Sequence, residues 1–309
     1  MKRGNKILVS TVAVILILVC CCFVFRNQLL PYGRRISYGI SDFFRDFGLK
    51  SPADITRIDD LHYGDDKMQV LDVYYLSGTQ EAQPTIISLH GGGYSYGSKH
   101  VYQYYCMNLA QRGFTVVNFS YRLAPKYKFP SQLEDTNSVL TYVCEHAKEL
   151  HIDTGNIFFV GDSAGGHLNF QYSTAVTNPE YAALLNLQIP DFTLRATALN
   201  CGVYSIEDTT ELIHYYFDQT RYADEMNIMK YVTEAFPPAF VMSATGDICL
   251  PYAEPLHKFL DETGIVNELH IYGDQTNKPP HVFHINIRND MATVCNDDEC
   301  AFFMRYVSK

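Results

Sequence analysis

Ser163 stands in a sequence setting that favours nucleophilic catalysis. The apolar residues Ile157 to Val160 indicate a strand, and Gly161-Asp162-Ser163-Ala164-Gly165-Gly166 follows it directly, before a helical stretch. A sharp turn from strand to helix has no room for side chains on either side of its apex, so glycine is needed at 161 and 165. We therefore expect Ser163 to be presented at the apex as a nucleophile.

A serine hydroxyl attacks well only when a base removes its proton and a carboxylate orients that base. Asp247 lies just beyond an expected strand, 239–243, and His281 follows the polar loop after the last expected strand, 268–272. The chain order of serine, acid and histidine is one in which such triads occur. We predict that Ser163, Asp247 and His281 form a catalytic triad.

Other residues could fill two of these roles. His284 is the alternative base, because it lies three residues beyond His281. Glu254 and Asp261 are alternative acids, but both fall inside the next expected helix, and Asp274 follows the wrong strand. We interpret these three carboxylates as solvated charges.

The reaction also needs backbone N–H groups aimed at the alkoxide that forms in the transition state. An expected strand at 85–89 ends in His90-Gly91-Gly92-Gly93-Tyr94, whose glycines allow the backbone to turn its amides inward. We predict an oxyanion hole built from the amides of Gly91, Gly92, Gly93 and Ala164. The pattern lacks the spacing of a nucleotide-binding loop, and we expect neither a cofactor nor a metal.

Elements that could hold these residues alternate along the chain. Short β-branched or aromatic runs are expected as strands at 70–75, 85–89, 115–119, 157–160, 196–201, 239–243 and 268–272. Helices are expected at 102–112, 132–150, 165–175, 253–263 and 292–307. This alternation predicts an α/β fold with a mostly parallel sheet flanked by helices. Residues 203–236 interrupt it and suggest a small cap insertion over the carboxyl edge of the sheet.

These motifs together resemble the hormone-sensitive-lipase-like branch of the α/β-hydrolases. The resemblance covers about residues 55–308 and rests on HGGGY at 90–94, SYRLAP at 120–125, FPSQLED at 129–135, GDSAGG at 161–166, Gly246-Asp247 and His281-Val282-Phe283. It implies a serine esterase for short-chain carboxylic esters with the triad named above. The chain departs from the family in its short N-terminal cap region and in Pro279-Pro280 before the histidine. In its short cap the chain also resembles small esterases that deacetylate carbohydrates. The sequence therefore leaves open which acyl and alcohol groups the substrate carries.

The N-terminal residues indicate a membrane segment. Nineteen uncharged residues, Ile7 to Phe25, would form a helix of roughly 28 Å, which is the thickness of a bilayer's hydrocarbon core. A cleaved signal peptide is the alternative, although Val19 to Phe23 do not provide the usual small-residue cleavage site. We expect residues 1–27 to be an uncleaved single-pass anchor. Three basic residues on each side leave its orientation open, and we favour a catalytic domain outside the cytoplasm.

Charge and cysteine content narrow the functional classes. The formal net charge is −10, and six of the 24 basic residues lie in residues 1–35, which contain no Asp or Glu. The rest of the chain is therefore strongly acidic, which argues against binding to nucleic acid. The six cysteines after the span lack metal-site spacing and are expected as free thiols. We divide the chain into the anchor, a linker or cap segment at 28–55 and a catalytic domain at 56–309.

Two rival functions use the same residues. An amidase or peptidase could use the same triad. Cleavage of an amide requires protonation of a poorer leaving group, and no motif in the sequence indicates whether the site can do this. A non-catalytic binding module of the same fold is the second rival, but such modules commonly lose a triad member and this chain has candidates for all three. The sequence leaves the oligomeric state open and implies a small-molecule ester as the main partner, together with a lipid bilayer through residues 7–25.

Overall fold

The computed structural model describes residues 26–204, 216–217 and 222–308, and the chain divides into two compact units at Phe47. Within the first unit, the described part is essentially one helix, α2 (Arg26–Asp46), most of which falls in the segment expected as a linker or cap at 28–55. The predicted span at 7–25 lies outside the described residues. Among the helices that the structure does describe, none is both long enough and apolar enough to cross a bilayer.

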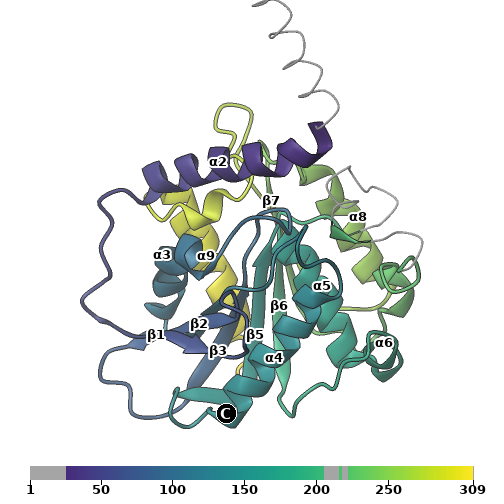
Figure 1. Ribbon diagram of the computed structural model, residues 1–309, viewed down its shortest axis with the longest axis horizontal. Coiled ribbons are helices and arrows are strands. Elements are labelled where there is room, and N and C mark those ends of the chain that lie inside the picture. Colours follow the sequence, from purple (N-terminus) through teal and green to yellow (C-terminus); the bar gives the residue numbers. More distant parts are fainter. Residues whose placement is uncertain (1–25, 205–215, 218–221, 309) are drawn as a thin grey trace, which may run out of the picture. The chain divides into compact units, whose positions relative to one another are not determined.

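The second unit, residues 48–309, is built on an eight-stranded sheet (Figure 1). Its strands are β1 (Ile55–His62), β2 (Val70–Leu76), β3 (Gln83–Leu89), β4 (Thr115–Phe119), β5 (Ile152–Asp162), β6 (Leu194–Asn200), β7 (Ala239–Ala244) and β8 (Asn267–Tyr272). Their order is β1-β2-β4-β3-β5-β6-β7-β8. Strand β2 pairs antiparallel with β1 and β4, and all other pairs are parallel. The prediction of a mostly parallel sheet is confirmed.

Helices cover both faces of this sheet. They are α3 (Lys99–Ala110), α4 (Ser131–Glu145), α5 (Ala164–Thr177), α6 (Pro179–Leu184), α8 (Leu250–Glu262) and α9 (Asp290–Met304), with short 3-10 turns η1 (Ile228–Tyr231) and η2 (Phe283–Ile285). The apolar cluster under α3 and α9 takes one set of alternate strand residues, such as Phe158. The clusters under α4, α5 and α8 take the other set, such as Phe159 (Figure 1). Burial on both faces explains why the central strands are continuous apolar runs.

Each of the seven expected strands is present, and each of the five expected helices overlaps an observed one. Among the described elements of this unit, strand β1, the short helix α6 and the two 3-10 turns were not predicted. Strand β1 is half-exposed at the sheet edge and contains Asp59 and Asp60, so it lacks the apolar run that marks the buried strands. Within the interval expected as a cap insertion, 203–236, residues 205–215 and 218–221 lie outside the described residues.

The sequence Ser-Tyr-Arg-Leu-Ala-Pro at 120–125 has a structural use. The guanidinium of Arg122 lies 2.7 Å from a carboxylate oxygen of the fully buried Asp135 and 3.0 Å from the half-exposed Glu134. The backbone N–H of Arg122 also donates to Asp135. This ion pair joins the loop after β4 to the N-terminal part of α4.

Candidate active site

Ser163 occupies the tight turn between β5 and α5. Its backbone has φ 53° and ψ −119°, a left-handed conformation that is strained for a residue with a side chain. A Cβ atom on Gly161 would lie 2.4 Å from the carbonyl oxygen of Gly165, and a Cβ on Gly165 would lie 2.0 Å from that of Leu89. The steric requirement for glycine at 161 and 165 is therefore visible in the structure, and the turn leaves the Ser163 side chain partly exposed.

The structure brings the other two predicted residues to this turn. The Nε2 atom of His281 lies 3.0 Å from Ser163 Oγ, and its Nδ1 atom lies 2.6 Å from Asp247 Oδ1. A carboxylate only accepts hydrogen bonds, so Nδ1 must carry the proton and Nε2 is left to accept one from the serine hydroxyl. A chain of two hydrogen bonds thus runs from Asp247 through His281 to Ser163.

The loop that carries His281 is fastened beside the end of β7. Gly246 N–H donates to the carbonyl oxygen of Pro279 at 3.1 Å, and Gly246 and Pro280 form an isolated parallel bridge. A Cβ on Gly246 would come within 2.7 Å of that carbonyl oxygen, so the close approach requires glycine. Asp247 and His281 each directly follow one of the two bridge residues, so the bridge brings the acid and the histidine together.

Asp247 is buried and held by several donors. Ser243 Oγ donates to Oδ2 at 2.8 Å, and the backbone N–H of Cys249 donates to Oδ1 at 2.8 Å. Burial alone would raise the pKa of Asp247, but its hydrogen bond to His281 and the charge of that ring outweigh this effect and lower the pKa to about 2. The acid is therefore ionised at neutral pH and favours the protonated histidine that must form during catalysis.

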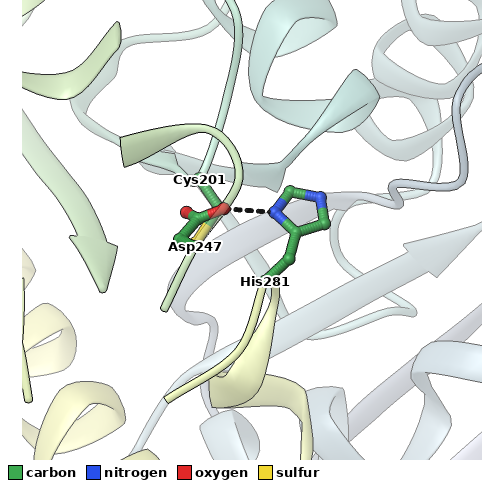
Figure 2. A group of neighbouring side chains, drawn as sticks. All are labelled: Cys201, Asp247 and His281. Atoms are coloured by element: carbon green, nitrogen blue, oxygen red, sulfur yellow. Dashed lines mark hydrogen bonds and ion pairs between the residues drawn. The ribbon is translucent and has the colours of Figure 1, made fainter. Parts of the chain in front are cut away.

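Cys201 lies beside the same two residues (Figure 2). The thiol, the carboxylate of Asp247 and the ring of His281 offer sulfur, oxygen and nitrogen atoms within 4.8 Å of one another, which is also a possible metal-binding group. Burial raises the pKa of the Cys201 thiol well above its usual value, whereas a metal requires the thiolate. The hydrogen bond from His281 to Asp247, shown in Figure 2, assigns the group to acid–base chemistry instead.

The alternative residues lie elsewhere or are unsuited to the roles. His284 is buried, burial lowers the pKa of its ring to about 3, and neither ring nitrogen has a hydrogen-bond partner among the described residues. Asp274 is exposed and accepts hydrogen bonds from the backbone N–H groups of Thr276 and Asn277, so it stabilises its own turn. Glu254 and Asp261 are exposed on α8, as expected for solvated charges.

The predicted oxyanion-hole residues divide into two groups. The N–H of Gly91 donates to the hydroxyl of Tyr102 at 2.9 Å and is therefore already engaged, contrary to our expectation for this amide. No described residue accepts a hydrogen bond from the backbone N–H of Gly92, Gly93 or Ala164. Gly92 and Gly93 have φ values of 112° and 57°, which only glycine adopts readily. Three amides are thus left as candidate donors to an alkoxide.

Sequence reasoning missed the residues that hold these parts together. The Tyr102 hydroxyl, which accepts from Gly91, donates to Asp162 Oδ2 at 2.8 Å, so the glycine loop is tied to the residue just before the nucleophile. The carbonyl oxygen of Asn200 accepts from Ser163 N–H at 2.9 Å, which anchors the turn to β6. Asp162 lies inside a recognised motif and could have been suspected, whereas Tyr102 shows no spacing signal on α3.

Comparisons with known proteins identify esterases among the relatives of this chain. A family model described as BD-FAE matches residues 71–211. An ethyl acetate hydrolase from Pseudomonas putida is 41% identical over 88 residues, which is 28% of each chain. An acetyl esterase from Salmonella paratyphi B is 26% identical over 249 residues, which is 72% of each chain. The match to the first of these relatives therefore spans less than a third of its length.

Solved structures share the fold. Esterase B from Lactobacillus rhamnosis superposes with a TM-score of 0.84 at 21% identity, covering 91% of this chain and 95% of that one. The fold, the arrangement around Ser163 and the relatives confirm the resemblance seen in the sequence. The chain therefore has the α/β-hydrolase fold, and the relatives that its sequence matches are esterases.

The tie between Tyr102 and the glycine loop makes a testable prediction. Tyr102→Phe removes the acceptor for Gly91 N–H and the donor to Asp162, so the neighbouring amides should be held less well. Because those amides would act mainly on the transition state, we expect kcat for an ester substrate to fall about tenfold with a change in KM of less than about twofold.

Tyr104→Phe is the matched control, because it removes a hydroxyl from the same helix that donates to the carbonyl oxygen of Leu49. Steady-state kinetics of both variants decide the question. An unchanged kcat in Tyr102→Phe, or an equal loss in Tyr104→Phe, would contradict a special role for the Gly91 tie.

Proposed function

We propose that the protein is an esterase that hydrolyses short-chain carboxylic esters through an acyl-enzyme on Ser163. The observation that carries the proposal is the hydrogen-bond chain from Asp247 through His281 to Ser163, next to three backbone amides for which no described residue is an acceptor. This arrangement supplies a nucleophile, a base, an orienting acid and donors for an oxyanion, which are the parts that acyl transfer requires.

In the first half of the reaction, Ser163 Oγ bonds to the ester carbonyl carbon while His281 Nε2 takes the hydroxyl proton. The carbonyl electrons move onto its oxygen, and the amides of Gly92, Gly93 and Ala164 donate hydrogen bonds to that oxygen. The intermediate then collapses, the bond to the alcohol oxygen breaks, and His281 gives its proton to the departing alcohol.

The second half repeats these steps with water. His281 takes a proton from water as the water oxygen attacks the acyl-Ser163 carbonyl. Collapse of the new intermediate breaks the bond to Ser163 Oγ, which takes the proton back from His281, and the carboxylic acid leaves. Asp247, which carries a negative charge throughout, stabilises the protonated histidine in both halves.

The preference for short acyl groups rests on the relatives. Two of them are described as an ethyl acetate hydrolase and an acetyl esterase, and esterase B has been solved with a tributyrin phosphonate inhibitor. By extension we propose acetyl to butyryl esters as substrates of this chain. Nitrophenyl esters from acetate to decanoate, acetylated sugars and a nitroanilide of the best acyl group would test the acyl length and the choice of ester over amide.

For residues 7–25 we propose a role as a membrane anchor, with the catalytic unit outside the cytoplasm. The support is the charge-free sequence of nineteen residues with basic residues on both sides. Cleavage of residues 1–27 would instead give a secreted esterase. The ester-hydrolysing residues all lie in the second unit, so the proposed chemistry does not depend on the anchor.

Replacement of the nucleophile is the direct test of the proposed chemistry. Ser163→Ala removes the covalent route, and we expect kcat for nitrophenyl acetate to fall by roughly 10⁴-fold to 10⁶-fold. The folded structure should persist, because only one partly exposed oxygen is lost. A rate within tenfold of the unmodified protein, in a variant with an unchanged circular dichroism spectrum, would remove Ser163 from this role.

The choice of His281 as base predicts a pH dependence. A histidine accepts a proton only when neutral, so the pH profile of kcat/KM should have an acidic limb in which the rate falls as the base becomes protonated. His281→Ala should abolish the activity and this limb. His284→Ala should keep the limb, since burial lowers the pKa of His284 to about 3 and keeps its ring neutral at all but strongly acidic pH. A normal limb in His281→Ala and none in His284→Ala would reverse the assignment.

The anchor predicts how the protein fractionates. Full-length protein should pellet with membranes and need detergent for release, while a chain lacking residues 1–27 should stay in the supernatant and remain active. N-terminal sequencing of the mature protein tests the alternative. A soluble chain that begins after residue 27 would mean that the segment is a cleaved signal peptide.

A further inference from the structure

Helix α2 presents a stripe of large apolar side chains to its surroundings. Ile36, Ile40 and Phe43 recur every three or four residues and so lie on one face of α2, with Phe44 beside them, and Phe47 directly follows the last residue of the helix, Asp46. We call these five residues the apolar stripe. Each is more than half exposed, from 55% for Ile40 to 70% for Phe44. Phe43 contacts the rings of Phe44 and Phe47, so the stripe is continuous.

The charged residues of this helix lie away from the stripe. Arg45 forms ion pairs with Asp42 at 2.8 Å and Asp46 at 2.7 Å, and these three side chains are only partly exposed. The helix therefore has a charged face and an exposed aromatic face. Aromatic and aliphatic side chains exposed together on one helical face indicate a surface that binds lipid or protein.

The sequence around α2 favours lipid as the occupant. The described part of the helix begins at Arg26, and the uncharged residues of the proposed anchor, 7–25, end at the residue before it in the sequence. It contains four Arg and two Asp, whereas the rest of the chain beyond it is acidic. A net positive charge is attracted to the anionic headgroups at a bilayer surface. Pro31, which has no N–H for the helical hydrogen bond, allows the helix to bend where it leaves the bilayer.

We propose that α2 lies in the membrane interface, with the apolar stripe directed into the acyl-chain boundary and the charged face toward the headgroups. This inference extends the proposed membrane anchor and does not depend on the proposed esterase chemistry. An anchor alone would leave the chain tethered at one point, whereas an interfacial helix adds a second contact that fixes residues 36–47 at the depth of the lipid headgroups.

The composition of the chain allows a clean test, because it contains no tryptophan. Phe44→Trp places the only tryptophan of the full-length protein in the apolar stripe. Tyr38→Trp is the matched control, since residue 38 lies on the same helix but on the side away from the stripe. Both variants would be reconstituted in vesicles of phosphatidylcholine with a minority of phosphatidylglycerol, with and without phosphatidylcholine brominated on its acyl chains.

The proposal predicts that bromolipid quenches the emission of the Phe44→Trp variant at least about threefold more strongly than that of the Tyr38→Trp variant. The emission maximum of the Phe44→Trp variant should also be blue-shifted, because its indole would lie in an apolar environment. Blue-shifted emission without quenching would mean that protein covers the stripe. Red-shifted emission quenched by aqueous iodide would mean that the stripe faces water. Either result overturns the proposal.

Flotation of the same vesicles separates this inference from the anchor. If the Phe44→Trp variant floats after alkaline carbonate washing but is quenched no more than the control, the anchor is retained and the interfacial helix is rejected. If it floats only before the wash and its indole is quenched, the anchor is rejected and the helix is supported as a peripheral contact. Protein that never floats rejects both.

Discussion

The close approach of the turn at Ser163 to its neighbouring strands is the constraint on which the site depends. The turn can form only because residues 161 and 165 have no side chains. A Cβ on Gly161 would collide with the carbonyl oxygen of Gly165, and a Cβ on Gly165 would collide with that of Leu89. Ser163 itself adopts a positive φ. A hydrogen bond from Ser163 N–H to Asn200 fixes the turn on β6. The strain of this conformation is therefore supported by packing, and it places the hydroxyl at the carboxyl edge of the sheet, where residues from other strands can reach it.

Two sets of buried polar contacts then complete the site. One holds the acid: Asp247 accepts from Ser243, the Cys249 amide and His281, which keeps its carboxylate ionised despite burial. The other holds the glycine loop through Tyr102 and Asp162. Buried polar groups are costly unless they are satisfied, so each set restrains the positions of its members. The result is a site organised before any substrate arrives.

Much of this arrangement could be predicted from the sequence, and the exceptions have physical reasons. Buried parallel strands are apolar runs, so β3 to β7 could be predicted directly, and the three residues of the hydrogen-bond chain follow strand ends in an order set by the fold. The edge strand β1 could not be read, because its half-exposed residues include charges. The engagement of Gly91 by Tyr102 also could not be foreseen, since it depends on how α3 is placed over the loop.

The central claim is that Ser163 is a nucleophile activated by His281, and covalent labelling tests it most directly. The full-length protein and its His281→Ala variant would be treated with a fluorophosphonate, digested, and examined by mass spectrometry over time. The account predicts that the fluorophosphonate rapidly labels one residue, Ser163, in the protein without substitutions, and labels the His281→Ala variant little or not at all. Modification at another residue, or equal labelling rates in the two proteins, would contradict it.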